Sequence, residues 1–333
     1  MLVDSFGRKL DYLRVSITDR CNLRCFYCMP SQGVPLKQHN SILRFEEIIK
    51  IIKIMADLGI SKVRITGGEP LVRKGIPSFF NSIKSIKGIE TFSFTTNGLL
   101  LGSYLDETEV LCEDSLPNSV NISLDSLDNL RYKKITRSED SNPEVITANI
   151  DRLLKKNVMV KINSVIIKSV NEQDILPLAA LAKDKNIAVR FIELMAIGRA
   201  SSKYKPVYAA EIADLIQKKY GNFTPYSDSI GSGPAVYYNL PDFKGKIGFI
   251  NPVTKNFCKT CNRLRLTSDG FLKLCLANNT EIDLKKMLRG DFSEIEFINS
   301  IKEYILEKPQ FHNFSDTICS SKNKHQSMSK IGG

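Results

Sequence analysis

The chain has 333 residues, of which 42% are hydrophobic and 25% charged, a balance typical of a soluble globular protein that excludes a disordered or fibrous chain. No apolar run approaches the roughly 20 residues that span a bilayer, and residues 1–15 lack the apolar core of a signal peptide, so we expect a cytoplasmic protein with reduced thiols. The net charge of +11 favours a polyanionic ligand, although a coding bias toward lysine explains it equally well.

Six short β-branched segments alternate with helical patterns along the first 200 residues. They cover 12–18, 62–66, 91–97, 119–125, 160–167 and 189–195. Between the first two, apolar residues from Phe45 to Met55 recur at helical spacing and predict a helix that ends near Gly59, and residues 143–156 predict a second crossover helix. Strand–helix alternation repeated six times predicts a parallel sheet, either open or curled into a barrel.

These predicted strands alternate polar and apolar residues, whereas buried parallel strands usually read as continuous apolar runs. The polar positions are Arg14, Ser16, Thr18, Lys62, Arg64, Thr66, Ser93, Thr95, Asn97, Asn121, Ser123, Asp125, Lys161, Asn163 and Arg190. Crossover helices must cover the apolar face, so the polar face points the other way, and unpaired charge is too costly for a packed core. We therefore expect a lumen that binds a polar, anionic molecule; an open sheet with one wetted face is the alternative.

Three cysteines, Cys21, Cys25 and Cys28, directly follow the first predicted strand, at the end of a barrel where active sites lie. Thiolates bind zinc and iron–sulfur clusters. A structural zinc site needs a fourth ligand nearby, and His39 lies eleven residues beyond Cys28. Three cysteines on a four-iron cluster would instead leave one iron open to a substrate or cofactor.

The pattern changes at about residue 201, where we place the start of a second, smaller region. Residues 209–221 predict a helix, and a Gly/Ser/Pro loop at 226–240 leads into short strands. Three more cysteines follow, Cys258, Cys261 and Cys275.

Two interpretations of this second cysteine group remain open. His312 or Cys319 could complete a zinc ribbon, or the group could hold a second iron–sulfur cluster with an open iron, which is the more economical reading beside the first group. Arg263 and Arg265 are spaced to share one face of an extended segment, and their guanidinium groups suit an anionic ligand.

The spacing CxxxCxxC with Tyr27 before the last cysteine, followed by "GGEP" at 67–70, resembles the radical S-adenosylmethionine enzymes. The wider set of motifs is similar to the GTP 3′,8-cyclase family, which begins molybdenum cofactor biosynthesis. It comprises "DSFGRKLDYLRVSITDRCNLRCFYCMP", "RITGGEPLVRKG", "TTNG", "NISLDSL", "VRFIELM", "FCKTCNRLRLTSDGFLKLCL" and the terminal "IGG", and it spans essentially the whole chain. The stretch 99–118 is longer than the family usually has, so no role is carried over to it, and we interpret Cys112 as a core residue.

The resemblance implies an α/β fold: a partial (β/α)6 TIM-like barrel of the radical SAM type in residues 1–200, with residues 201–333 carrying a second cluster. It implies two [4Fe-4S] clusters, held by the six cysteines, and S-adenosylmethionine, contacted by Tyr27, Gly68, Ser123 and Met195. GTP would contact Arg14, Arg64, Thr95, Lys161, Arg263 and Arg265, with Lys62 and Arg190 as weaker additions. Gly332 and Gly333 would enter the active site as a catalytic tail; a frayed terminus is the alternative.

The implied reaction is the radical cyclisation of GTP to (8S)-3′,8-cyclo-7,8-dihydroguanosine 5′-triphosphate, with basic lumen residues on the triphosphate and the second cluster on the guanine edge. The implied partners are GTP, a reductant, the downstream cyclic pyranopterin monophosphate synthase and a second copy of the chain, with no nucleic acid and no membrane. Another two-cluster radical enzyme, for example one that modifies a peptide, stays open as an alternative. So does a zinc-ribbon nucleic-acid-binding protein, which would leave "GGEP" and the polar lumen unexplained.

Overall fold

The structure is a computed structural model that describes residues 1–35, 37–111, 116–195, 204–228, 230–278 and 280–312. Cys112, Cys319, Gly332 and Gly333 lie outside these residues. Within them, a small hairpin pairs β1 (Leu2–Val3) with β2 (Lys9–Leu10), and the other strands form one sheet of twelve.

The large sheet is mostly parallel. Its strands, in spatial order, are β14 (Glu281–Asp283), β13 (Phe271–Lys273), β12 (Arg263–Leu266), β3 (Tyr12–Ser16), β4 (Lys62–Thr66), β5 (Thr91–Thr96), β6 (Ser119–Ser123), β7 (Met159–Val165), β8 (Ala188–Ile192), β11 (Lys246–Ile250), β10 (Val236–Asn239) and β9 (Thr224–Tyr226). Every neighbouring pair from β12 to β11 is parallel, and the strands beyond them at both edges are antiparallel. The chain therefore has the α/β fold expected from its sequence.

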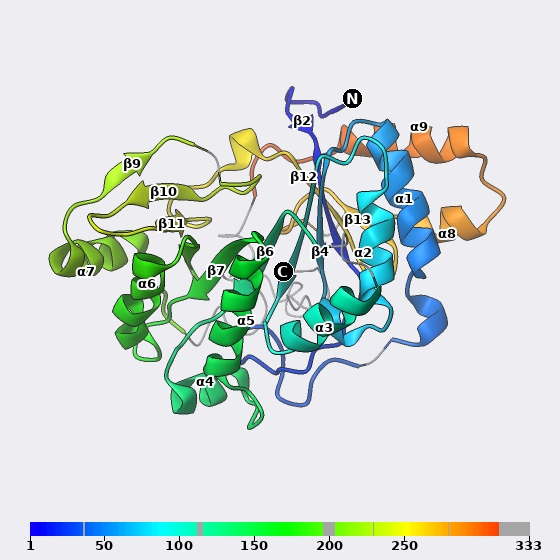
Figure 1. Ribbon diagram of the computed structural model, residues 1–333. Coiled ribbons are helices and arrows are strands. Elements are labelled where there is room, and N and C mark those ends of the chain that lie inside the picture. The colour runs from blue at the N-terminus through cyan, green and yellow to red at the C-terminus, as the bar shows by residue number, and fades with distance from the viewer. Residues whose placement is uncertain (36, 112–115, 196–203, 229, 279, 313–333) are drawn as a thin grey trace.

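The helices are α1 (Phe45–Asp57), α2 (Ile76–Lys84), α3 (Leu101–Leu111), α4 (Asn129–Thr136), α5 (Pro143–Lys155), α6 (Ile175–Asp184), α7 (Ala209–Tyr220), α8 (Leu284–Arg289) and α9 (Glu294–Ile305). Helices α1 to α6 lie between successive parallel strands, α7 precedes the antiparallel edge strands, and α8 and α9 follow the last strand. Short 3-10 turns lie at His39–Ser41, Pro70–Val72, Glu172–Asp174 and Cys258–Thr260. Figure 1 shows α1, α2, α3, α5 and α6 along the outer face, with α7 at one end and α8 and α9 at the other.

The apolar strand positions pack beneath these helices. Phe80 of α2, for example, packs against Phe92 and Phe94 of β5, with ring centroids 4.9 and 5.1 Å away. Because side chains alternate along a strand, the intervening polar residues face away from the helices. The period-two pattern therefore separates a helix-covered core from a polar face, as the sequence predicts.

The six predicted strands are β3 to β8, and the predicted helices are α1, α5 and α7. Helix α1 ends two residues before Gly59, which adopts a φ of 102°, a left-handed conformation that glycine accepts readily. The sequence did not predict that strands of the second region, β11 and β12, extend the same parallel sheet beyond β8 and β3. The sequence segments that precede β11 and β12 lack the regular strand–helix alternation that identified the first six strands. Among the described residues, no helix is both long and apolar enough to cross a membrane.

An ion pair links helix α1 to helix α8. Glu47 caps α1 by accepting from the backbone N–H of Arg44 at 2.7 Å. Its two carboxylate oxygens also accept from Arg289, from Nε at 2.7 Å and from Nη2 at 2.9 Å. These bonds, led by the one from Arg289, lower the pKa of Glu47 from 4.5 to about 2.

We expect Glu47→Gln to lower the free energy of unfolding by about 1–3 kcal/mol at neutral pH, because hydrogen bonds to a charged group are lost. The folded-state pKa is depressed, so this contribution is fully present above pH 4.5 and is lost as the pH falls toward about 2. Urea unfolding at about pH 7, 5 and 3.5 should show the native–variant difference shrinking with acidity. The exposed neighbour variant Glu46→Gln is the control, and a difference that stays constant with pH would contradict the assignment.

Candidate active site

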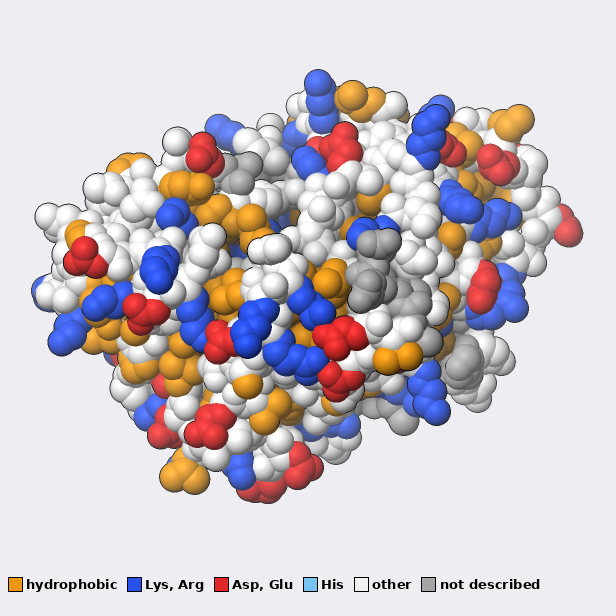
Figure 2. Space-filling model, viewed as in Figure 1, with side chains coloured by type: hydrophobic (Ala, Val, Ile, Leu, Met, Phe, Trp, Pro, Cys, Tyr) orange, Lys and Arg blue, Asp and Glu red, His pale blue; other side chains and the backbone are white. Residues whose placement is uncertain are grey.

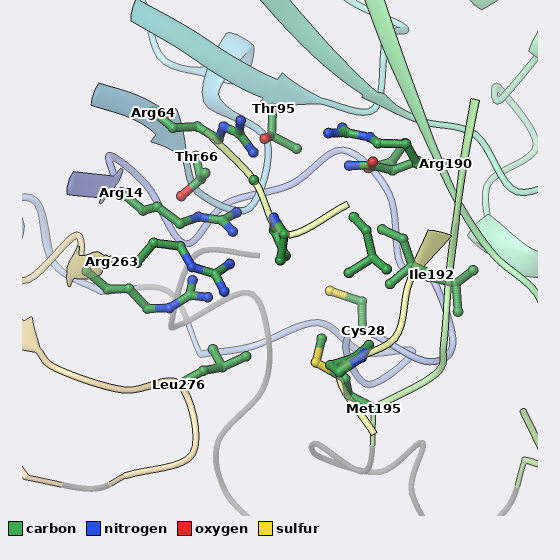
Figure 3. Close-up of a pocket in the computed structure, with 18 of the residues that line it drawn as sticks. Arg14, Cys28, Arg64, Thr66, Thr95, Arg190, Ile192, Met195, Arg263 and Leu276 are labelled. Atoms are coloured by element: carbon green, nitrogen blue, oxygen red, sulfur yellow. The ribbon is translucent and has the colours of Figure 1, made fainter. Parts of the chain in front are cut away.

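A cavity with a volume of about 350 Å³ lies on the polar face of the parallel strands. Polar side chains from β3 to β8 and from β12 contribute to its walls. In Figure 3, Arg14, Arg64 and Arg263 point into it from one side and Arg190 from the other, while Cys28 and Met195 lie together at one end. The polar positions of seven strands thus face one shared space.

Several cations are buried near the cavity, whereas the surface in view has no cationic patch. On the face shown in Figure 2, Lys and Arg are interspersed with Asp and Glu rather than gathered into a patch. By contrast, Arg64, Lys161, Arg190 and Arg265 are each at most 8% exposed. Buried cations around a cavity suit a small anionic molecule.

The first cysteine group lies at the carboxyl end of β3, where Cys21, Cys25 and Cys28 line the cavity. The segment after β4 packs directly against the start of this loop: Gly68 N donates to Thr18 O at 2.7 Å, and Glu69 N donates to Arg20 O at 2.8 Å. A Cβ on Gly68 would lie only 2.2 Å from Arg20 O, so glycine is required by the close approach of two backbones.

A buried carboxylate, Glu69, organises the same end of the cavity. It accepts from Thr96 Oγ1 at 2.8 Å, from Asn97 N at 2.7 Å and from Leu71 N at 3.1 Å. Burial raises the pKa of Glu69 to about 7, although these hydrogen bonds oppose the rise. A carboxyl group that titrates near neutrality beside three thiols is typical of a functional site.

Tyr27 is held by Asp125, and both side chains line the cavity. The Tyr27 hydroxyl donates to Asp125 Oδ2 at 2.5 Å, while Asp125 Oδ1 accepts from Val165 N at 2.8 Å. Burial raises the pKa of Tyr27 and also that of Asp125, the latter to about 6. This pair fixes the aromatic ring that precedes Cys28.

The second cysteine group lies at the opposite end of the strands. Cys258 and Cys261 precede β12, Cys275 follows β13, and β12 runs parallel to β3 but antiparallel to β13. A backbone hydrogen bond places the segment after Cys261 beside the start of β3: the N–H of Tyr12 donates to Asn262 O at 3.3 Å. All three thiols line the same cavity as the first group. The cavity is therefore bounded by cysteines at both ends.

Three arginines stand in register between these ends. Arg265 of β12 pairs with Arg14 of β3, which pairs with Arg64 of β4, and all three line the cavity. Burial, and then the charge of Arg265, lowers the pKa of Arg14 well below its ordinary value; burial and Arg263 lower that of Arg265 to about 10. Cations held together in this way favour a bound anion.

Two further cations lie on the far side. Arg190 donates from Nη2 to Asn121 Oδ1 at 2.6 Å, and its buried Nε has no hydrogen-bond partner among the described residues. Lys161 donates to Ser119 Oγ at 3.2 Å, and burial, followed by the charges of Arg190 and Arg64, lowers its pKa to about 7. An anion in the cavity would satisfy Arg190, which lines it, and would act on Lys161 through its charge.

Most of the predicted site residues line the cavity: the six cysteines, Tyr27, Gly68, Ser123, Met195, Arg14, Arg64, Thr95, Arg263 and Arg265. Lys161 does not line it: the side chain is buried, donates to Ser119 Oγ and interacts with the charges of Arg190 and Arg64. Lys62 pairs with Asp11 at 2.7 Å instead. Gly332 and Gly333 lie outside the described residues.

Sequence reasoning did not assign Glu69, Asp125 or His312, all of which line the cavity. Glu69 could have been found, since it lies within "GGEP", and Asp125 was already on a polar strand face. His312 follows α9 far along the chain, and it was considered only as a zinc ligand.

The donor set of each cysteine group fits an iron–sulfur cluster. Three soft thiols face one cavity at each end. No three His, Cys, Asp or Glu side chains in the described parts of the chain converge closely enough to hold a single metal ion. A four-iron cluster does not require such convergence, because each cysteine binds a different iron.

Comparisons with known proteins agree with this arrangement. Residues 15–182 match the Radical SAM superfamily, and residues 187–314 match the family described as Molybdenum Cofactor Synthesis C. The chain is 43% identical to a GTP 3′,8-cyclase of Petrotoga mobilis over 100% of both chains, and 43% identical to one of Clostridium perfringens over 93% of this chain and 94% of that one. It is 38% identical to molybdenum cofactor biosynthesis protein 1 of Dictyostelium discoideum, over 97% of this chain and 51% of that one.

Among solved structures, Streptococcus suis SuiB bound to S-adenosylmethionine has a similar fold, with a TM-score of 0.60 and 15% identity over 98% of this chain and 76% of that one.

We expect Gly68→Ala to displace the loop that carries Cys21, because the new Cβ cannot fit against the Arg20 carbonyl. After anaerobic reconstitution, iron per chain should fall by about half, since the second cysteine group is untouched. Gly233→Ala is the matched control: Gly233 also lines the cavity, but its Cβ would meet nothing within 4 Å. Native iron content in Gly68→Ala would show that the close approach does not position the first group.

Proposed function

The chain belongs to the GTP 3′,8-cyclase family of radical S-adenosylmethionine enzymes, and we propose that the arginine-lined cavity between its two cysteine groups is where it acts on GTP. The enzyme catalyses the first step of molybdenum cofactor biosynthesis, the radical cyclisation of GTP to (8S)-3′,8-cyclo-7,8-dihydroguanosine 5′-triphosphate. The observation that carries the assignment of the site is the placement of one cysteine group at each end of a single cationic cavity.

We divide the chain into a partial (β/α)6 barrel of the radical SAM type, residues 1–200, and a second-cluster region, residues 201–333. The two family matches meet earlier, one ending at 182 and the other beginning at 187, and a boundary at 200 keeps β8 with the other five strands of the barrel. The burial of the polar strand faces around a cavity supports a curled sheet.

At the carboxyl end of the strands, Cys21, Cys25 and Cys28 would hold the first [4Fe-4S] cluster. When bound, this cluster supplies the electron that starts the radical reaction of S-adenosylmethionine. Gly68 leaves room for close approach of the backbone. The other residues proposed to contact S-adenosylmethionine, Tyr27, Ser123 and Met195, line the same cavity. Asp125 orients Tyr27 through its hydrogen bond.

At the other end, Cys258, Cys261 and Cys275 would hold the second cluster beside the guanine base. The triphosphate and base would bind to four cations and a hydroxyl that line the cavity, Arg14, Arg64, Arg263, Arg265 and Thr95, and the buried charge of Lys161 would add to the attraction. Fixing the nucleotide at both ends places its ribose toward the first group, and such positioning can account for much of the rate of a reaction. Gly332 and Gly333 would complete the site.

We infer further partners from family membership. A reductant must supply electrons, a cyclic pyranopterin monophosphate synthase would take the product, and the chain would form a homodimer. A cytoplasmic location would keep its thiols reduced and able to hold clusters.

The direct test is 5′-deoxyadenosine production by anaerobically reconstituted protein given dithionite and S-adenosylmethionine, with GTP, ATP or no nucleotide. We expect production stimulated by GTP alone, together with the cyclised product. Equal production in all three reactions would remove GTP as the substrate of this cavity.

An Arg265→Ala variant should still cleave S-adenosylmethionine but bind GTP about tenfold or more weakly, because a buried charge-assisted contact is lost.

The low pKa of Lys161 predicts proton uptake on GTP binding. A triphosphate would raise this pKa from about 7, so above pH 7 the bound state holds more protons than the free one, and affinity falls as the pH rises. Calorimetry at about pH 8 in buffers of different ionisation enthalpy measures the uptake. Lys161→Met should remove most of it, whereas Lys62→Met, whose lysine pairs with Asp11, should not. Equal uptake by Lys161→Met and the native protein would exclude Lys161 as the group that titrates.

A further inference from the structure

Lys308 is a buried lysine three residues after α9, with only 2% of its surface exposed. Its ammonium group makes no ion pair with a carboxylate among the described residues. Instead it donates to two backbone carbonyls, Arg263 O at 2.9 Å and Leu274 O. A buried ammonium group that contacts only neutral carbonyls has a large desolvation cost, so a nearby negative charge would stabilise it.

The two carbonyls belong to the two arms of the second cysteine group. Leu274 immediately precedes Cys275, and Arg263 follows Cys261 by two residues. One ammonium therefore ties together the chain segments that present two of the three thiols. Burial lowers the pKa of Lys308, and the negative forms of Cys261 and Cys275 act in the opposite direction. The thiolates are thus the charge partners that the lysine otherwise lacks.

The segment that carries Lys308 is itself fixed to this group. Arg8, paired with Asp4 at 2.6 Å, donates to Cys258 O at 2.8 Å and to Pro309 O at 2.8 Å. The backbone N–H of His312 donates to the Cys258 sulfur. Lys308 is therefore held in place from both sides.

Lys308 differs from the other cations around these thiols. Arg263 and Arg265 also interact with the cysteine charges, but both line the cavity and are available to a substrate. Lys308 does not line the cavity, and its donors are directed at the protein backbone. Its charge therefore stays beside the cysteines whether or not a nucleotide is bound.

We propose that Lys308 is a positioning residue of the second cysteine group. It joins the two chain segments that carry Cys261 and Cys275, and it places a fixed positive charge beside the bound cluster. The inference rests on the proposed function, since it needs a cluster at this site. A nearby cation stabilises the reduced, more negative form of a cluster, so Lys308 makes the second cluster easier to reduce.

The test is a redox titration, followed by electron paramagnetic resonance, of full-length protein in which Cys21, Cys25 and Cys28 are serine, so that the second group alone holds a cluster. Lys308→Met keeps the aliphatic stem and removes the charge. At the midpoint potential of the parent protein, we expect the ratio of reduced to oxidised cluster in Lys308→Met to be about tenfold lower than in the parent. This is equivalent to a shift of about 59 mV for one electron. Lys308→Arg should keep the parent potential. Lys302→Met, at an exposed position of α9, is the control and should not shift it.

An unchanged potential in Lys308→Met, with or without a loss of iron, would overturn the proposal and leave Lys308 a structural role. If Lys308→Met holds no cluster, iron content decides: recovery in Lys308→Arg but not in Lys308→Gln supports the charge, and loss in Lys308→Arg as well overturns it. A native chain that binds only the first cluster would overturn the proposed function and this inference together. Two clusters with an unresponsive potential would overturn this inference alone.

Discussion

The burial of several cations around one cavity is the constraint on which the rest of this structure depends. Arg64, Lys161, Arg190 and Arg265 are all nearly inaccessible to water, and lowered pKa values mark the cost of that burial for the last three. Their described partners are mostly neutral: Ser93, Ser119 and Asn121 accept from three of them. Such an interior is tolerable because the opposite face of the parallel strands packs into a large apolar core. The free protein is therefore prepared for an anionic ligand before that ligand arrives.

Strand polarity converts this cavity into a site with two different ends. The first cysteine group follows β3 and the second precedes β12, and because these neighbouring strands are parallel, the two groups face each other along their length. Residues far apart in sequence thus come to lie at the two ends of one cavity. Such a site can hold a molecule the length of a nucleoside triphosphate at both of its ends, while the middle of the molecule is not bound by protein side chains.

Much of this arrangement could be predicted from the sequence, because period-two alternation is a strong local signal. It assigned Arg14, Arg64 and Thr95 to the cavity without any knowledge of neighbouring strands. That Lys161 is buried outside the cavity could not be predicted, since alternation gives the face of a residue but not its depth. Lys308 was missed because it follows an ordinary amphipathic helix, where a lysine is usually exposed. Nor does a local pattern state that β12 pairs with β3: that pairing is a long-range contact.

The pairing of β12 with β3 has a consequence for biosynthesis. The strand that covers one edge of the radical SAM core, β12, follows β3 at a long distance in sequence, so β3 leaves the ribosome long before its partner. Until residues 263–266 emerge, one edge of β3 presents unpaired N–H and C=O groups, and Arg14 lacks its neighbour Arg265. Such an edge is a template for pairing with other chains. Prematurely terminated products should therefore be prone to aggregation, and a chaperone that shields this edge would act on every molecule made.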